Sequence, residues 1–141
     1  MSQILLFLTL LIFGAVTVNA ETNVNRELEE KIIQFVKAGD EQNPNLLDGV
    51  LHPDYRITYA FPWDTKVSIV NHDLYRQMLS DKKLGGKKRT VKIEDISVRG
   101  NIAVVRTRMQ SDVMKFSTFF SLINIGEGWR IIADLPYAEK I

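Results

Sequence analysis

The sequence predicts an α+β domain in which N-terminal helices pack on a curved antiparallel sheet. The segment from Thr90 to Leu135 consists of strand-like stretches joined by short turns, which is typical of an antiparallel meander. Amphipathic helical patterns occupy much of the chain before it. Runs of helix followed by runs of strand favour separate helical and sheet layers over alternating parallel units.

The first twenty residues are expected to lie outside this domain. Ile4 to Val18 is almost wholly apolar, and Val18-Asn19-Ala20 then fits the small-x-small pattern that a signal peptidase accepts. The apolar run is shorter than the roughly 20 residues that a bilayer-spanning helix needs. No Lys or Arg precedes the run, so an uncleaved N-terminal anchor is the alternative. We therefore predict a signal peptide over 1–20, a single domain over 21–141, a secreted or periplasmic location, and no stable membrane insertion after cleavage.

Composition excludes several classes of site and partner. The chain has no cysteine, so it depends on a hydrophobic core instead of disulfides and cannot form thiolate metal sites. A net charge of +1 gives no long-range field for nucleic acid, and we predict no nucleic-acid partner. The basic cluster around Gly85-Gly86 is interpreted as a solvated loop instead of a phosphate or anionic-surface site.

Two helices are predicted near the start of the domain. Apolar residues at three- and four-residue spacing indicate an amphipathic helix over 24–36, and Gly39 lies where it would end. Asn43-Pro44 is typical of the cap and first position of a second, shorter helix. His52-Pro53 would end that helix, because the residue before a proline is disfavoured in helical geometry.

Two strands and a third helix are predicted next. Tyr55–Phe61 and Lys66–Val70 are strand-like, and Pro62-Trp63-Asp64 separates them. Asn71 can cap the third helix, in which apolar residues share one face.

Three turns set the register of the meander. Gly100-Asn101 fits a two-residue hairpin turn that needs positive φ, Ser111-Asp112 suits a second reversal, and Gly126–Gly128 suits a third. Side chains paired across an antiparallel ladder lie on the same face. The turns predict these pairs: Val98 with Ala103, Val105 with Thr118, Thr107 with Phe116, and Phe120 with Asp134.

One face of this sheet is predicted to be concave and covered by the helices. A bulge at Glu94-Asp95 would sharpen the bend of the first strand of the meander. The other face mixes charged and apolar side chains, which fits either burial against another subunit or scattered surface apolar groups. Trp129 and Ile131 are assigned to this outer face. The inner face carries Ala103, Val105, Thr107, Met109, Met114, Phe116, Thr118, Phe120, Leu122, Ile132 and Asp134.

The order and spacing of these elements resemble the nuclear transport factor 2-like superfamily, and within it the branch known as putative lumazine-binding. The resemblance implies a cone-shaped α+β fold. That scaffold hosts isomerases, dehydratases, epoxide hydrolases, cyclases and plain binding domains, so it does not settle the activity. The matching segments are ELEEKIIQFVKAGD, LHPDY, HDLYRQML, GGKKRTVKIEDISVRGNIAVV and FSLINIGEGWRI.

Asp134 is the candidate acid of the cone. A carboxylate held beside Phe120 on the inner face would have its pKa raised by desolvation, which suits a general base. A location at the rim, or a one-residue slip that sends the side chain outward, is the alternative. His52 and His72 lie far apart with no second ligand at helical spacing, so no metal site is predicted.

Aromatic side chains with a few polar groups predict a pocket for a small aromatic or apolar ligand. Core packing is the alternative for Phe116 and Phe120, and Trp63 is expected at the pocket mouth. The predicted ligand-binding residues are Tyr59, Trp63, Tyr75, Thr107, Phe116, Thr118, Phe120 and Asp134.

The leading hypothesis is a non-catalytic small-ligand-binding domain without a cofactor, which forms a homodimer through the outer sheet face. One alternative is a lyase or isomerase that uses Asp134 as general base. Another is a protein-interaction module whose cone is filled by its own side chains.

Overall fold

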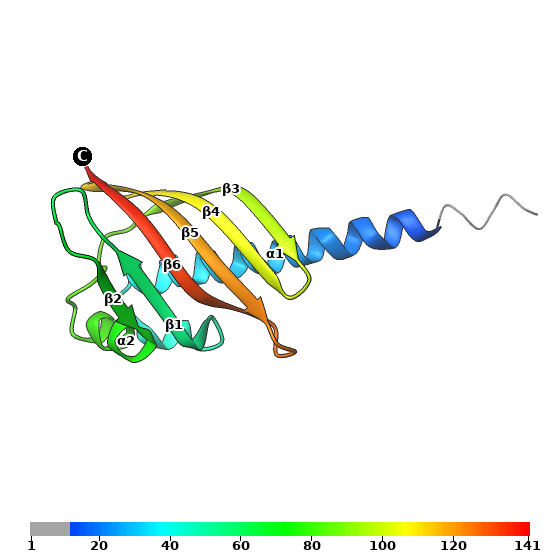
Figure 1. Cartoon of the computed structure of the whole chain (residues 1–141), viewed down its shortest axis with the longest axis horizontal. Helices are drawn as coiled ribbons and strands as arrows, with labels where there is room; N and C mark the ends of the chain where they lie inside the picture. Colours follow the sequence, from blue (N-terminus) through cyan, green and yellow to red (C-terminus); the bar gives the residue numbers. More distant parts are fainter. Residues whose placement is uncertain (1–11) are drawn as a thin grey trace, which may run out of the picture.

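Helices form one layer of the molecule, and a curved six-stranded sheet forms the other (Figure 1). The computed structural model describes residues 12–141. The strand order is β2-β1-β6-β5-β4-β3; β1 and β6 are parallel, and the other neighbours are antiparallel. This arrangement confirms the predicted α+β class. The elements are α1 (Ile12–Asp40), the 3-10 helix η1 (Pro44–Leu47), β1 (Leu51–Tyr59), β2 (Ser68–Asn71), α2 (His72–Ser80), β3 (Thr90–Arg99), β4 (Ile102–Gln110), β5 (Met114–Asn124) and β6 (Trp129–Lys140).

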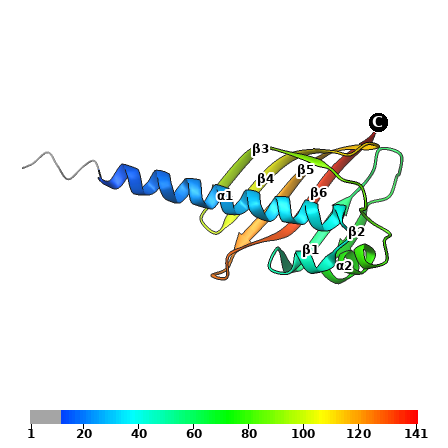
Figure 2. The same ribbon diagram turned by 180° about the vertical axis from the view of Figure 1, so that it is seen from behind.

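Helix α1 is longer than predicted, and its N-terminal part projects beyond the sheet (Figure 1 and Figure 2). Its apolar stripe is buried from Leu28 to Val36, as the spacing predicts. The helix passes through the predicted cleavage point after Ala20, and the predicted signal residues 1–11 lie outside the described part of the chain. Export therefore stays a prediction. Within residues 12–141, no helix combines the length and hydrophobicity of a membrane span.

The predicted second helix is wrong beyond its first turn. Asn43 caps it as expected, but the helix ends after one 3-10 turn, and β1 begins at Leu51. His52-Pro53, expected to end a helix, lies inside β1. The strand tolerates this proline because its pairing with β6 shifts between Leu51 and Arg56, where the ladder is irregular.

The predicted strand and helix bounds after this point hold within a few residues. Strand β1 ends at Tyr59 instead of Phe61, and β2 occupies Ser68–Asn71 instead of Lys66–Val70. The predicted cap of α2 is confirmed, because the Asn71 side chain accepts a hydrogen bond from the backbone N–H of Leu74.

The predicted pairing of β4 with β5 is wrong by two residues, although Val98–Ala103 and Phe120–Asp134 are confirmed. Thr107 pairs with Thr118, and Val105 pairs with Phe120. The cause is the turn: the Ser111 hydroxyl accepts hydrogen bonds from the two backbone N–H groups that follow Asp112, so the loop is longer than two residues. Because side chains alternate with a period of two, this slip leaves the face assignments intact.

A bulge in β6 overturns three of the face assignments. The β5–β6 pairing shifts between Ser121 and Leu122, which leaves Ile132 without a partner on β5. Ile131 and Trp129 therefore turn inward and are buried, whereas they were assigned to the outer face. Ile132 leaves the inner face for the same reason.

The bulge predicted in β3 is confirmed. Pairing with β4 shifts between Ile93 and Asp95, so Glu94 is the inserted residue. Its carboxylate contacts Arg106 and Arg108 on the outer face, with N–O distances of 3.5 Å and 2.6 Å. The bulge thus bends the strand while its side chain pairs with the cations of the neighbouring strand.

The core lies between α1 and the inner face of the sheet. Phe35 of α1 packs edge-on against Phe120 at 5.2 Å between ring centroids, and it stacks on Tyr75 of α2 at 5.6 Å. The backbone N–H of Trp129 donates to the Glu27 carboxylate, which ties the start of β6 to α1. Toward the other end of α1, the helix and sheet separate around a pocket.

Candidate functional site

The pocket lies between the C-terminal part of α1, helix α2 and the inner face of the sheet. It has a volume of about 430 Å³, which is in the range of small-molecule sites. The segment 83–89, which joins α2 to β3, forms part of its wall. Apolar side chains provide most of the remaining lining: Phe35, Ile57, Val70, Met78, Leu84, Met109, Val113, Met114, Phe116 and Pro136.

Two buried polar side chains of the sheet reach this pocket, Asp134 of β6 and Thr118 of β5. Asp134 is 5% exposed, and its Oδ2 accepts a hydrogen bond of 3.3 Å from the Tyr55 hydroxyl. Asp134 Oδ1 and Thr118 Oγ1 have no hydrogen-bond partner among the described residues. Each unpaired buried polar atom costs roughly 1–3 kcal/mol, so these two atoms favour a partner that enters the pocket.

The surroundings of Asp134 favour its neutral form. Burial raises the pKa of this carboxyl to about 7, while the Tyr55 hydrogen bond and the charge of Arg89 act in the opposite direction. Burial also raises the pKa values of the Tyr55 and Tyr75 hydroxyls, and both stay protonated as donors. Asp134 can therefore accept or donate a proton near neutral pH.

A half-buried ion pair fixes the segment 83–89 to the end of α1. The Arg89 guanidinium donates to the Asp40 carboxylate at 2.6 Å and to the backbone carbonyl of Val36 at 3.0 Å. The backbone N–H of Gly86 donates to the carbonyl of Gly39 at 3.0 Å. Part of the basic cluster therefore anchors the segment 83–89 to α1, whereas its composition alone indicates only a solvated loop.

Aromatic side chains extend from the pocket along the β1–β2 loop. Tyr59 and Phe61 line the pocket, with ring centroids 4.8 Å apart. Trp63 stacks on Phe61 at 4.9 Å, and the Lys140 ammonium lies 4.6 Å from the Trp63 ring centroid. Trp63 is 49% exposed, so this loop offers an aromatic surface next to the pocket.

The structure brings most of the predicted ligand-binding residues together. Asp134, Phe116 and Phe120 share the inner face as predicted, and the rim location considered for Asp134 is wrong. Phe120 and Thr107 are fully buried in the core beneath the pocket, and Trp63 lies beside it. Ligand contact stays a prediction for all eight residues. Those that line the pocket are Tyr59, Tyr75, Phe116, Thr118 and Asp134.

Neither histidine reaches Asp134. The His52 Nδ1 atom accepts from the backbone N–H of Asp54, and His72 Nδ1 lies 2.8 Å from Asp73. Tyr55 takes the place of a histidine as the partner of the acid. Across residues 12–141, no three His, Asp or Glu side chains converge in a way that could hold a metal ion.

Sequence reasoning missed two features of the site. Tyr55 was placed at the start of a predicted strand but was not recognised as the donor to Asp134, because their contact joins strands far apart in the sequence. Lys83, Lys87 and Arg89 were not assigned to the pocket, although all three line it. The adjacent glycines Gly85-Gly86 were the available signal, because paired glycines permit close backbone approach.

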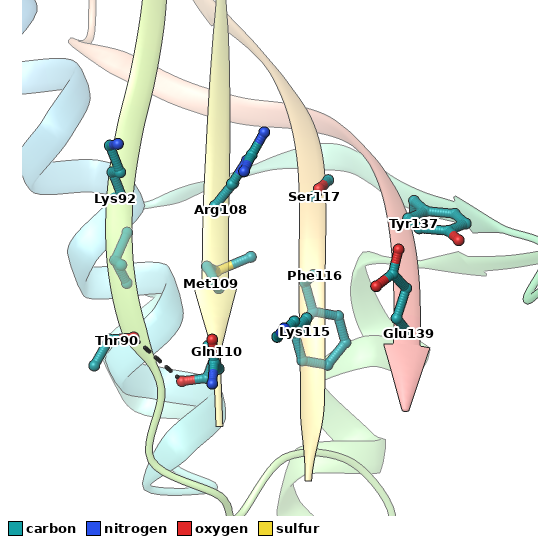
Figure 3. Close-up of a pocket in the computed structure, with 11 residues that line it drawn as sticks. Thr90, Lys92, Arg108, Met109, Gln110, Lys115, Phe116, Ser117, Tyr137 and Glu139 are labelled. Atoms are coloured by element: carbon teal, nitrogen blue, oxygen red, sulfur yellow. Dashed lines mark hydrogen bonds between the residues drawn. The ribbon is translucent and has the colours of Figure 1, made fainter. Parts of the chain in front are cut away.

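A second, more open depression lies on the outer face of the sheet. Figure 3 shows side chains from β3, β4, β5 and β6 around it. Lys92, Arg108 and Lys115 give it positive charge, and Glu139 gives it a negative end; Tyr137 flanks the acid. It is lined about equally by polar and apolar surface, and it holds none of the buried unpaired atoms of the inner pocket.

Comparison with known proteins agrees with this architecture. A family model described as "Putative lumazine-binding" matches residues 23–135. No curated protein matches the sequence.

Solved structures show the same fold at low sequence identity. A nuclear transport factor 2-like protein of unknown function from Silicibacter pomeroyi has a TM-score of 0.71 and 16% identity, over 86% of this chain and 98% of that one. One from Shewanella baltica has a TM-score of 0.73 and 13% identity, over 84% and 95%. A superfamily protein from Salmonella enterica serovar Typhimurium has a TM-score of 0.63 and 18% identity, over 82% and 91%.

Proposed function

Because this chain belongs to the family described as "Putative lumazine-binding", we propose that it is a small-ligand-binding domain whose cone holds a flat, largely apolar molecule. One observation carries the proposal: an apolar pocket of about 430 Å³ contains unpaired polar atoms of Asp134 and Thr118. A filled cone, which would suit a pure interaction module, does not fit that volume.

The polar atoms define what the ligand must supply. A ring nitrogen or carbonyl could accept from the neutral Asp134 carboxyl and from the Thr118 hydroxyl, and an N–H or O–H group could donate to Asp134 Oδ1 when this carboxyl is ionised. The remaining surface of the ligand would pack against methionine and aromatic side chains, which adapt to flat shapes. Lumazine, a flat fused-ring heterocycle with N–H donors and carbonyl acceptors, can supply both groups, although it is more polar than the pocket lining.

We expect lumazine to bind the pocket and Val113→Trp to weaken that binding by about tenfold or more, because the indole occupies space at the pocket wall. Val113 lines the pocket and is 45% exposed, so the substitution should leave the core intact. A fluorescence titration of lumazine measures the effect. Native mass spectrometry of the purified protein tests in parallel for a retained ligand.

Val67→Trp is the matched control, because Val67 is 68% exposed and does not line the pocket. It should bind lumazine as the unchanged protein does. Equal binding by the Val113→Trp and unchanged proteins would place the ligand elsewhere. A native mass spectrum without a retained ligand, together with no fluorescence change on titration of lumazine or related heterocycles, would remove the support for a binding domain.

An enzymatic function is the second candidate, and the pocket-facing Asp134 favours it. A carboxyl with a pKa of about 7 suits a general base. The binding function is preferred because no histidine or second acid lines the described pocket to share proton transfer. The ligand is incubated with the protein for a prolonged time and then recovered. An unchanged ligand supports binding. A ligand that the unchanged protein converts, and that the Asp134→Asn variant does not convert, supports catalysis.

We further propose that two copies pair through the outer sheet face. Exposed apolar side chains run across it, and charged side chains lie beyond them at one end of the face, where Lys115 of β5 pairs across the ladder with Glu139 of β6. A two-fold pairing would bury these apolar side chains against the same side chains of the second copy. The apolar side chains are Ile102, Val104, Phe119, Leu135 and Tyr137.

Phe119→Glu is expected to convert a dimer into a monomer, because it places a charge among these apolar groups. Phe119 is 49% exposed in the single chain, so its replacement should not unfold the domain. Light scattering coupled to size exclusion measures the mass of each variant. Ile69→Glu, at a 63% exposed position on β2, should stay dimeric. A monomeric unchanged protein would contradict the dimer.

Export to the periplasm or outside the cell is part of the same proposal. The apolar segment that ends at Val18-Asn19-Ala20 supports it. The intact mass of the exported protein should correspond to a chain that begins at Glu21. Recovery of the full-length chain with the membrane would indicate an anchor instead.

A further inference from the structure

The charged groups of the inner pocket are separated by depth. Four charged side chains line it: the acid Asp134, which is 5% exposed, and the cations Lys83, Lys87 and Arg89 of the segment after α2. Lys83 and Lys87 are exposed, and Arg89 is partly buried against α1. The pocket therefore has an acid at its buried end and the two exposed lysines, Lys83 and Lys87, at its mouth.

Two of the three cations already have partners. Arg89 pairs with Asp40 at 2.6 Å, and Lys87 lies 3.4 Å from the carboxylate of Asp112. Lys83 has no ion-pair partner among residues 12–141, although its backbone N–H donates to the carbonyl of Met78 and so fixes its position at the end of α2. Lys83 is thus the uncompensated charge of the pocket.

The buried end of the pocket adds little negative charge to offset the positive charge of Lys83. Desolvation favours the neutral form of Asp134 up to about pH 7. A neutral acid leaves the pocket with a positive mouth and an apolar body. A ligand that matches this pattern has a hydrogen-bonding group at one end and a negative group at the other.

We propose that the ligand is a flat, largely apolar molecule with a single anionic group, such as an aromatic carboxylate or sulfonate, which Lys83 meets at the mouth while the opposite end faces Asp134. This inference rests on the proposed binding function and specifies its ligand class. Lys83 acts as a specificity residue, because it selects the anion over the neutral molecule of the same shape.

Two fluorescent probes with the same aromatic body test the proposal: anilinonaphthalene sulfonate, which is anionic, and phenylnaphthylamine, which is neutral. Both are titrated at low ionic strength into the unchanged protein. We expect roughly fivefold tighter binding of the sulfonate, the size of effect that one exposed charge pair provides. Lys83→Gln should abolish most of this preference without weakening the neutral probe.

Lys88→Gln is the matched control, because Lys88 is an exposed lysine of the same basic cluster that does not line the pocket. It should retain the preference for the sulfonate. Val113→Trp should weaken both probes, which assigns their binding to the pocket. Thermal unfolding checks that each variant folds as the unchanged protein does.

The outcomes separate this inference from the binding function. If neither probe responds to Val113→Trp, the pocket is not their site and the binding function loses its support. If both probes bind the pocket equally well, the binding function stands and the anionic ligand class is overturned. A preference that survives Lys83→Gln, or that Lys88→Gln removes equally, also overturns the role of Lys83.

Discussion

Replacing Asp134 by asparagine is expected to stabilise the protein above pH 7 and to remove most of the dependence of its stability on pH between about pH 4 and pH 7. The pKa of Asp134 rises from 3.8 to about 7 on folding, because burial penalises the charged carboxylate. Between these pH values the folded protein holds a proton that the unfolded chain releases. The contribution of Asp134 to stability is therefore fully present below about pH 4, falls as the pH rises, and levels off above about pH 7.

The expected size of this loss follows from the pKa difference. About three pKa units correspond to a loss on the order of 4 kcal/mol in the free energy of unfolding. Asparagine carries no charge at any of these pH values, and its side-chain carbonyl can still accept the hydrogen bond of Tyr55. The variant should thus differ little from the unchanged protein at pH 4 and exceed its stability at pH 8.

Urea denaturation of both proteins at several pH values measures the free energy of unfolding and its slope. Glu127→Gln is the control, because Glu127 is exposed and makes no ion pair within residues 12–141, and its stability curve should run parallel to that of the unchanged protein. Parallel curves for the Asp134→Asn and unchanged proteins would show that Asp134 is not buried in its neutral form. The proposed pocket chemistry would then lose its acid.

The inner face of the sheet could be predicted because its pattern tolerates errors of two residues. The predicted turn at Ser111 was too short, yet Thr118 and Phe116 were still assigned to the correct face of the sheet. The bulge at Ile132 had the opposite effect, because a one-residue insertion reverses the side chains beyond it. Trp129 and Ile131 were assigned wrongly for this reason, while Asp134 lies past the bulge and was assigned correctly.

The location of the pocket could not be predicted from local patterns. It depends on β1 and β6, which pair in parallel although many residues separate them, and this pairing brings Tyr55 to Asp134. The sequence around His52-Pro53 also favours the end of a helix locally, whereas tertiary pairing makes it a strand. Contacts between distant segments, not local propensity, determine which polar groups meet in the pocket.

The second large effect is expected at Gly85, where the segment 83–89 contacts the end of α1. Gly85 has a φ of +78°, and a Cβ atom there would overlap the carbonyl oxygen of Gly39. That carbonyl also accepts the hydrogen bond from the Gly86 N–H. Gly85→Ala should therefore cost at least about 3 kcal/mol, through the left-handed backbone and through displacement of the segment.

Gly49→Ala separates these two causes. Gly49 has a φ of +73°, but nothing lies within 4 Å of a Cβ atom at that position. Its replacement should cost only the backbone strain, about 1 kcal/mol. Chemical denaturation of both variants measures the difference, and equal losses would show that the contact with Gly39 does not hold the segment.

The same pair of variants connects stability to the pocket. Lys83, Leu84, Lys87 and Arg89 line the pocket from the segment that Gly85 holds against α1. A shift of that segment moves Lys83 away from the mouth and disturbs the Arg89–Asp40 ion pair. Gly85→Ala should thus weaken ligand binding at temperatures where the protein is still folded, and Gly49→Ala should not. Unchanged binding in Gly85→Ala would mean that the mouth is formed without this contact, and that the position of Lys83 does not depend on the two glycines.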